Sequence, residues 1–308
     1  MALSRSLLPL LLPLLLVLVV ALILPKTTAE TLLAQSCEGS NYTANSEFRS
    51  NLQLLLASLS ASNSYFSTDV VGSSSKAYGL VMCRGDVDPD DCKACVHTAS
   101  ENITQLCVRS KQAIVLYDRC QLRYSDARFF SSSRDGWIIL MYNVGDFQRD
   151  PEASTAAAKR LMGKVADRAA RNVSSPLLFA DGTIAYRSDL PVIYGLAQCT
   201  SDLSSGICRQ CLQQILDVYW SSAYASKKGG RILGYSCNFR YEIYPFFAGD
   251  PTISLGATAA SAASLSPSPT PVTNVQVATQ SGEGEDSYLH SNLFFKIFYL
   301  QHGGSSWI

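Results

Sequence analysis

One cysteine cluster occurs twice in this chain, and it constrains the fold more than any other feature. Four cysteines recur in the same order: Cys83, Cys92, Cys95 and Cys120 in the first copy, and Cys199, Cys208, Cys211 and Cys237 in the second. In each copy eight residues separate the first cysteine from the second, and two separate the second from the third. Tyr-Gly-Leu precedes the cluster in both copies, and Arg-Tyr follows the last cysteine in both. The chain is therefore a tandem duplication of one domain.

The repeat also restricts the disulfide pairing. Only Cys37 and Cys107 have no counterpart in the second copy. Two cysteines that are absent together are most simply the two ends of one bridge, so we pair them. The remaining four in each copy can pair in three ways. The unmatched pair and the four matched cysteines of each copy are all even in number, so we expect no free thiol.

The N-terminus predicts export. Residues 1–29 read as a secretory signal, with Arg5 ahead of an apolar run over residues 7–24 and a cleavage site at residues 27–29. The alternative is an uncleaved signal anchor, because the run is long enough to span a bilayer. Prolines in and after the run favour cleavage. We expect a secreted, extracellular protein from Glu30 onward, and a membrane protein only if the segment is retained.

Two further observations suit that compartment. Three sequons predict N-glycosylation, at Asn41, Asn102 and Asn172. In an oxidising compartment the cysteines are expected to form disulfides. The competing interpretation, a zinc knuckle from Cys92, Cys95 and His97, is disfavoured because no second ligand pair follows at zinc-site spacing. We expect no metal.

Composition and length bound the remaining possibilities. Lys plus Arg and Asp plus Glu both number 25, so there is no basic footprint for nucleic acid. The 308 residues allow two domains of roughly 110 residues each. The expected parts are a signal peptide at 1–29, domain one at 30–135, domain two at 139–249, and a Ser/Pro-rich linker with a disordered tail at 250–308.

Periodicity predicts an α+β fold for each domain. Helices are expected over residues 48–59, from Asp88-Pro89, from Asp150-Pro151 and over residues 208–219. Strands are expected at 78–82, 113–117, 121–124 and 137–142 in the first copy, and at 192–197, 231–234 and 238–244 in the second. Residues 30–47 and 60–75 read as turns and loop. Each unit is thus two helices and a short antiparallel sheet.

These clusters resemble the ginkbilobin-homologous, or stress-antifungal, domain of plants, over roughly residues 33–248. Tandem copies form cysteine-rich repeat secretory proteins and the ectodomains of cysteine-rich receptor-like kinases and plasmodesmata-located proteins. The resemblance implies two helices packed on an about five-stranded antiparallel sheet. It also implies the bridges Cys37–Cys107, Cys83–Cys92, Cys95–Cys120, Cys199–Cys208 and Cys211–Cys237. A receptor relative would continue into a membrane helix and a kinase. Neither signature follows here, so we expect the terminal stretch to be an unrelated reading extension or an alternative product of a receptor gene.

The sequence does not favour catalysis. Two of the three histidines lie in the tail, and the cysteines are committed to bridges, so no nucleophile–base arrangement can be argued. We expect no enzyme and no cofactor. The resemblance implies an extracellular interaction module in stress and defence signalling, with cell-surface proteins or receptor-like kinases as partners. A minor alternative is an apoplastic redox sensor that uses the cysteines.

A second alternative is a mannose-binding, antifungal lectin acting through domain two. The antifungal founder of the family resembles a mannose lectin that uses an Asn, an Arg six residues before the last cysteine and a Glu five after it. Domain two has Arg231 and Glu242 at these positions, and Asn143 is the candidate amide. A guanidinium, a carboxylate and an amide suit vicinal sugar hydroxyls.

Domain one matches none of the three sugar positions, where it has Glu38, Ile114 and Ser125. The competing interpretation for domain two is a surface ion pair between Arg231 and Glu242 on neighbouring strands. The aromatic residues near Cys237 are expected to fill the core rather than to stack on sugar.

Overall fold

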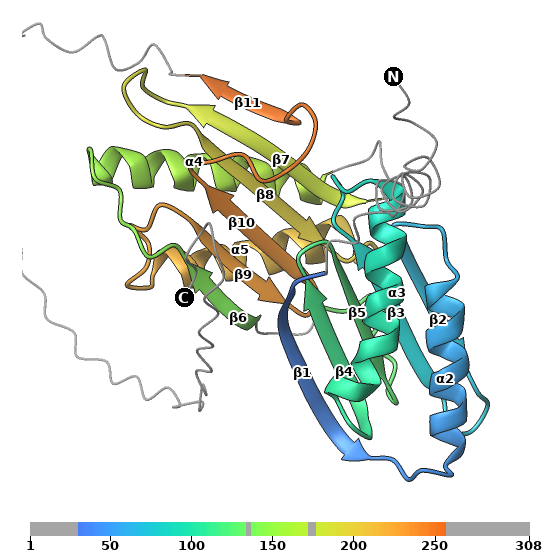
Figure 1. Cartoon of the computed structure of the whole chain (residues 1–308). Helices are drawn as coiled ribbons and strands as arrows, with labels where there is room; N and C mark the ends of the chain where they lie inside the picture. Colours follow the sequence, from blue (N-terminus) through green and yellow to red (C-terminus); the bar gives the residue numbers. More distant parts are fainter. Residues whose placement is uncertain (1–29, 134–136, 172–176, 257–308) are drawn as a thin grey trace, which may run out of the picture. The chain divides into compact units, whose positions relative to one another are not determined.

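The computed structural model describes residues 30–133, 137–171 and 177–256. Domain one contains β1 (Leu32–Asn41), α2 (Glu47–Ser60), β2 (Phe66–Val71), β3 (Ala77–Cys83), α3 (Pro89–Leu106), β4 (Ser110–Tyr117) and β5 (Cys120–Ser125). Its five strands form an antiparallel sheet in the order β1-β4-β5-β3-β2, and α2 and α3 cover one face (Figure 1).

Domain two repeats this plan with one more strand. It contains β6 (Trp137–Tyr142), α4 (Pro151–Ala170), β7 (Leu178–Ala185), β8 (Ile193–Cys199), α5 (Ser205–Trp220), β9 (Gly230–Gly234), β10 (Cys237–Glu242) and β11 (Ile253–Gly256). The sheet order is β11-β7-β8-β10-β9-β6, antiparallel except for the parallel pair β11–β7. The predicted fold class is therefore confirmed.

Several strand expectations were wrong. Residues 30–47 and 60–75 contain β1 and β2, β7 was not expected, and β11 lies in the predicted linker. The strand at residues 137–142 pairs with β9 and so belongs to the second sheet rather than the first. The edge strands β1, β2 and β11 are only partly buried and rich in polar or small residues, so they lack the apolar runs of the central strands.

The helix starts follow the predicted capping chemistry. Asp88 caps α3, and its carboxylate accepts from the backbone N–H of Asp90 at 3.0 Å. Asp150 caps α4 and accepts from Ala153 at 3.2 Å. A proline occupies the start of each helix, where its missing N–H costs nothing.

The five disulfides are those that the resemblance implies: Cys37–Cys107, Cys83–Cys92, Cys95–Cys120, Cys199–Cys208 and Cys211–Cys237. Cys83 and Cys120 lie opposite each other on β3 and β5, yet each bonds to a cysteine of α3. The two bridges therefore fix the helix to two adjacent strands. The cysteines that the structure describes include no free thiol.

A second buried face explains how the domains associate. Beyond the two cores under the helices, an apolar cluster joins Ile114 and Leu116 of β4 to Ile139, Met141 and Leu233 of domain two. Leu116 and Leu233 both stand four residues before the last cysteine of their copy. The two domains thus bury the same strand position, on the sheet face away from the helices.

Three expectations fall on residues that the structure does not describe. These are the signal at 1–29, the sequon at Asn172 and the tail from residue 257. Among the described residues, no helix combines the length and apolar composition needed to cross a bilayer.

Candidate functional site

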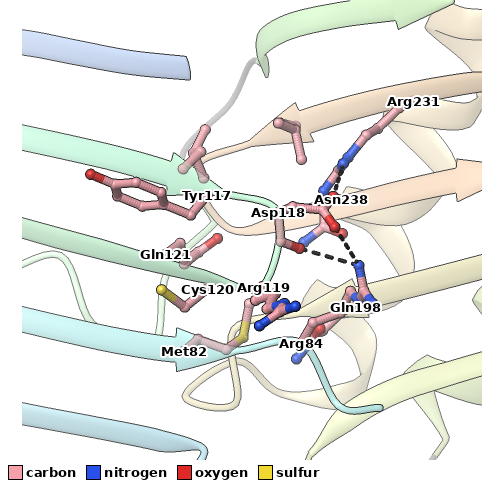
Figure 2. A pocket seen from close by; sticks show the side chains of 12 residues that line it. Met82, Arg84, Tyr117, Asp118, Arg119, Cys120, Gln121, Gln198, Arg231 and Asn238 are labelled. Carbon is pink, nitrogen blue, oxygen red and sulfur yellow. Dashed lines mark hydrogen bonds and ion pairs between the residues drawn. The ribbon is translucent and has the colours of Figure 1, made fainter. Parts of the chain in front are cut away.

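A carboxylate at the tip of one hairpin is the centre of the polar part of the domain interface. Asp118 and Arg119 connect β4 to β5, and Asp118 projects toward domain two (Figure 2). Its Oδ1 accepts from Arg231 Nη1 of β9 at 2.6 Å, and its Oδ2 accepts from Arg84 Nη1 at 3.0 Å. Arg240 Nη1 of β10 lies 3.7 Å from Oδ1. One carboxylate therefore pairs with guanidinium groups from both domains.

The charges of this cluster are largely removed from water. Only 8% of the Arg231 side chain is exposed. Arg84 also forms a two-point pair with Asp86, at 2.6 and 2.9 Å. Burial opposes ionisation of Asp118, but Arg231, Arg84 and Arg240 outweigh it and hold the pKa of Asp118 well below its usual range. Burial lowers the pKa of Arg231, while Asp118 counteracts that effect.

Domain two contributes a further buried carboxyl near this cluster, Glu242. It is 0% exposed, and its Oε1 accepts from Arg240 Nε at 3.3 Å. Its Oε2 has no hydrogen-bond partner and lies against Gly229, where a Cβ atom would sit 2.1 Å away. Burial raises the pKa of Glu242 to about 7, although Arg240 favours the charged form.

The structure places Arg231 and Glu242 on the adjacent strands β9 and β10 and Asn143 directly after β6, but both charged residues are buried. The backbone N–H of Asn143 donates to Gly229 at 2.9 Å, and its side-chain Oδ1 accepts from Gly145 at 3.0 Å. Arg231 and Glu242 lie on β9 and β10, where they pair with Asp118 and Arg240. The surface ion pair predicted between Arg231 and Glu242 is therefore wrong, because both are buried and have other partners.

The space beside Asp118 is small. The pocket between Arg84, Gln198 and Arg231 has a cavity volume of about 20 Å³, which is room for about one water molecule (Figure 2). Small-molecule sites are usually ~300–1,000 Å³. In this closed arrangement the cluster fastens the two domains together and does not admit a sugar.

A second hairpin tip makes the reciprocal contact. Tyr235, between β9 and β10, donates to Glu38 of β1 and lies 3.2 Å from the hydroxyl of Ser36. Tyr235 and Asp118 each stand two residues before the last cysteine of their copy. Arg123 lies over the Tyr235 ring, with 5.1 Å to the centroid. Each domain thus inserts the tip of the same hairpin against the sheet of the other.

Sequence reasoning missed Asp118, Arg84 and Gln198, whose side-chain amide donates to the Cys83 carbonyl at 2.9 Å. One signal was available. In a two-layer domain the sheet face away from the helices is normally exposed to solvent and carries polar residues. The strands at 113–117 and 231–234 instead have apolar residues on both faces. Such strands indicate a second buried face.

Comparisons with known proteins agree with this architecture. The family model described as "salt stress response/antifungal" matches residues 36–127 and 147–244, one match for each domain. The chain belongs to this family.

Several relatives cover the same two domains. Cysteine-rich repeat secretory protein 38 of Arabidopsis thaliana is 34% identical over 73% of this chain and 89% of the relative. The antimicrobial ginkbilobin-2-like protein of Castanea crenata is 36% identical over 67% of this chain and 84% of the relative. Cysteine-rich receptor-like protein kinase 6 of Oryza sativa subsp. japonica is 35% identical over 70% of this chain. The match spans only 32% of that kinase, so the chain corresponds to about a third of such relatives.

A solved structure supports the fold. The tandem DUF26 ectodomain of the Arabidopsis thaliana cysteine-rich receptor-like protein PDLP8 superposes with a TM-score of 0.60 at 24% identity. The superposition covers 70% of this chain and 98% of that one.

Proposed function

We propose that this chain is an extracellular, non-enzymatic interaction module whose two domains act as one binding unit in stress and defence signalling. The observation that supports the proposal most directly is the buried interface between the domains. Asp118 pairs with Arg231 across it, and apolar side chains of both sheets pack beside that pair. A fixed relation between domains is what a recognition surface composed of both requires, because ordering it on binding would cost affinity.

The relatives support the cellular setting of the proposal. Some have names that describe secretory proteins, and others are receptor-like kinases. We propose that the chain is exported to the apoplast and that its partners are cell-surface proteins such as receptor-like kinases. A binding role without catalysis fits the predicted commitment of the cysteines to bridges.

The test is a binding screen with the full chain. The immobilised protein is titrated with a panel of receptor-like kinase ectodomains by biolayer interferometry. We expect saturable binding to at least one ectodomain, and weaker binding by Asp118→Asn, which loosens the domain interface. Asp167→Asn, which removes a carboxylate from an exposed pair with Arg209, is the matched control. If no ectodomain binds while a neutral cell-wall glycan does, the proposal is wrong.

Mannose binding by domain two is the second candidate. The observation in its favour is that Arg231 and Glu242 come from the adjacent strands β9 and β10, while Asn143 directly follows β6, the other neighbour of β9. In the closed interface Arg231 is held by Asp118, so we expect the intact chain to bind mannose weakly or not at all. Calorimetric titration of the wild type and of Asp118→Asn tests this. Binding that appears in the variant and is lost again on adding Arg231→Ala would support the lectin; no binding by either protein would exclude it.

A further inference from the structure

In each domain the chain that follows the last cysteine strand forms a strap over the sheet face away from the helices. Both straps carry a Phe-Phe pair nine and ten residues after that cysteine, and an Arg stands three residues after it. Arg123 Cζ lies 4.1 Å from the centroid of Phe129, and Arg240 Cζ lies 4.3 Å from that of Phe246. The second ring of each pair meets a tyrosine of the neighbouring strand, at 6.0 and 5.9 Å between centroids. Each tyrosine precedes a glycine that faces the helices, so it points to the opposite face. The strap is therefore part of the repeat.

The strap of domain two is also bonded to domain one, at the charge cluster of the interface. This C-terminal strap, residues 243–250, joins β10 to β11 and crosses β8 and β7 (Figure 1). The Phe246 carbonyl accepts from Arg84 Nη2 at 3.4 Å. The N–H of Ala248 donates to Asp86 Oδ2 at 3.2 Å. Because Arg84 Nη1 bonds the interface carboxylate, one guanidinium contacts both the interface and the strap.

The edge of β7 is specialised for the strand to which this strap leads. Asp181 Oδ1 accepts from the N–H and the hydroxyl of Thr252, at 2.7 and 2.9 Å, and the N–H of Asp181 donates to that hydroxyl at 3.0 Å. At Gly182 a Cβ atom would stand 2.9 Å from the carbonyl oxygen of Ile253, which is closer than real Cβ atoms come. Asp and Gly are both depleted in strands. Here β11 explains both, because the first bonds it and the second leaves it room.

The corresponding edge of domain one lacks this specialisation. By strand register, Thr68 and Asp69 of β2 replace the Asp-Gly pair of β7. Asp69 Oδ1 accepts from the outward N–H of Val70 at 2.7 Å, so a side chain occupies a backbone donor that an added strand would need. Among the described residues β2 is the end of its sheet. The strand site is therefore a property of domain two and not of the fold.

We propose that the C-terminal strap couples this strand site to the domain interface, so that β11 stays docked on β7 while Arg84 and Asp86 hold the strap. Opening the interface moves both side chains away with domain one, and the strap loses two hydrogen bonds. β11 has four residues and, among the described strands, pairs only with β7, so its docking depends on the chain that holds it there. The described part of the chain ends with β11, at Gly256, and the state of the interface is thus passed to that end. The coupling is reciprocal, because releasing β11 frees the strap from domain one.

The proposal goes beyond the interaction module, and hydrogen–deuterium exchange of the full chain tests it without a partner. Asp86→Ala removes the acceptor of Ala248 and one carboxylate that holds Arg84. We expect the amides of β11 to exchange about fivefold faster or more, while those of β4 and β5 exchange as in the wild type. The control Asp126→Asn removes an exposed carboxylate of the same domain, which accepts from Gln112, and should leave β11 unchanged.

The reverse direction uses Thr252→Val, which keeps the size of the side chain but removes the hydroxyl that bonds Asp181. We expect faster exchange in residues 84–87 of domain one, by about fivefold or more, although Thr252 does not contact them. The control Ser254→Val changes an exposed position of the same strand and should leave residues 84–87 as in the wild type. Unchanged exchange of β11 in Asp86→Ala, or equal acceleration in Asp126→Asn, would overturn the proposal. So would a Thr252→Val chain in which β11 loosens and residues 84–87 do not; this variant decides alone if Asp86→Ala unfolds domain one.

Discussion

Replacing Asp118 by Asn tests whether the carboxylate fastens the two domains. The substitution keeps size and one oxygen acceptor but removes the charge that Arg84 and Arg231 share. Breaking a buried ion pair by removing one partner costs ~3–5 kcal/mol, and one hydrogen bond to a charged group is worth ~1.5–3 kcal/mol. The Asp118 side chain is 34% exposed, so water partly compensates the freed guanidinium groups. We expect the free energy of unfolding to fall by about 2–3 kcal/mol.

The assay is urea denaturation with the disulfides intact, because guanidinium salt would screen the charges. Asp167→Asn again serves as the control, and breaking its exposed pair with Arg209 should change stability by less than about 1 kcal/mol. The folded pKa of Asp118 is depressed, so its contribution is present above the unfolded pKa and is lost only as pH falls below that value. Above the unfolded pKa that contribution is complete, so the cost of the substitution should not grow from about pH 5 to 8. A cost equal to that of the control, or one that grows toward pH 8, would refute the reasoning.

Three further predictions concern other parts of the chain. Burial raises the pKa of Glu242 from 4.5 to about 7, so this group lowers the free energy of unfolding by ~3 kcal/mol as pH rises through that window. Glu242→Gln should therefore reduce the difference in unfolding free energy between pH 5 and pH 8, measured by urea denaturation. An unchanged difference would contradict the prediction. Cys37 is the one exposed cysteine of the five bridges, so a mild thiol should open Cys37–Cys107 first and cost domain one ~4 kcal/mol on the loop-entropy model; peptide mapping that finds another bridge opened earlier would count against it. Asn41 is exposed whereas the Asn102 amide donates to the Tyr117 hydroxyl at 3.2 Å, so glycopeptide analysis should find higher occupancy at Asn41 than at Asn102.

The elements with strong local signals were predictable from the sequence. The apolar spacing of Leu52, Leu55 and Leu59 predicted α2, and all three are buried. Asp88-Pro89 and Asp150-Pro151 predicted two helix starts, because capping and the proline act within a few residues. Edge strands were not predictable in this way. They obtain their stability from pairing with a neighbour, as β11 does with β7, and a parallel partner distant in sequence leaves no periodic signal.

The candidate site shows the same division. The spacing from the last cysteine placed Arg231 and Glu242 correctly on adjacent strands, because both strands lie close to Cys237 in the sequence and pair with each other. The apolar residues on both faces of the strand at 231–234 signal a second buried face, but the partner of Arg231 on that face was not predictable, because it belongs to the other domain. The sequence of domain two alone does not show that Asp118, more than 100 residues earlier, would take the guanidinium that a sugar needs.

The duplication itself explains why the two unlike copies pair. Counted from the last cysteine, Arg231 of domain two corresponds to Ile114 of domain one, and both belong to the buried face. If two copies of domain one met through this face, Asp118 would lie against isoleucine and would keep only Arg84 of its own domain as a partner. If two copies of domain two met, Arg231 would lie against Tyr235 and would have no carboxylate. Leaving a buried charge unpaired costs several kcal/mol, so only the unlike pair gives the buried Arg231 a carboxylate. The differences between the copies at two equivalent positions, Ile114/Arg231 and Asp118/Tyr235, therefore favour the unlike pair over a pair of second copies.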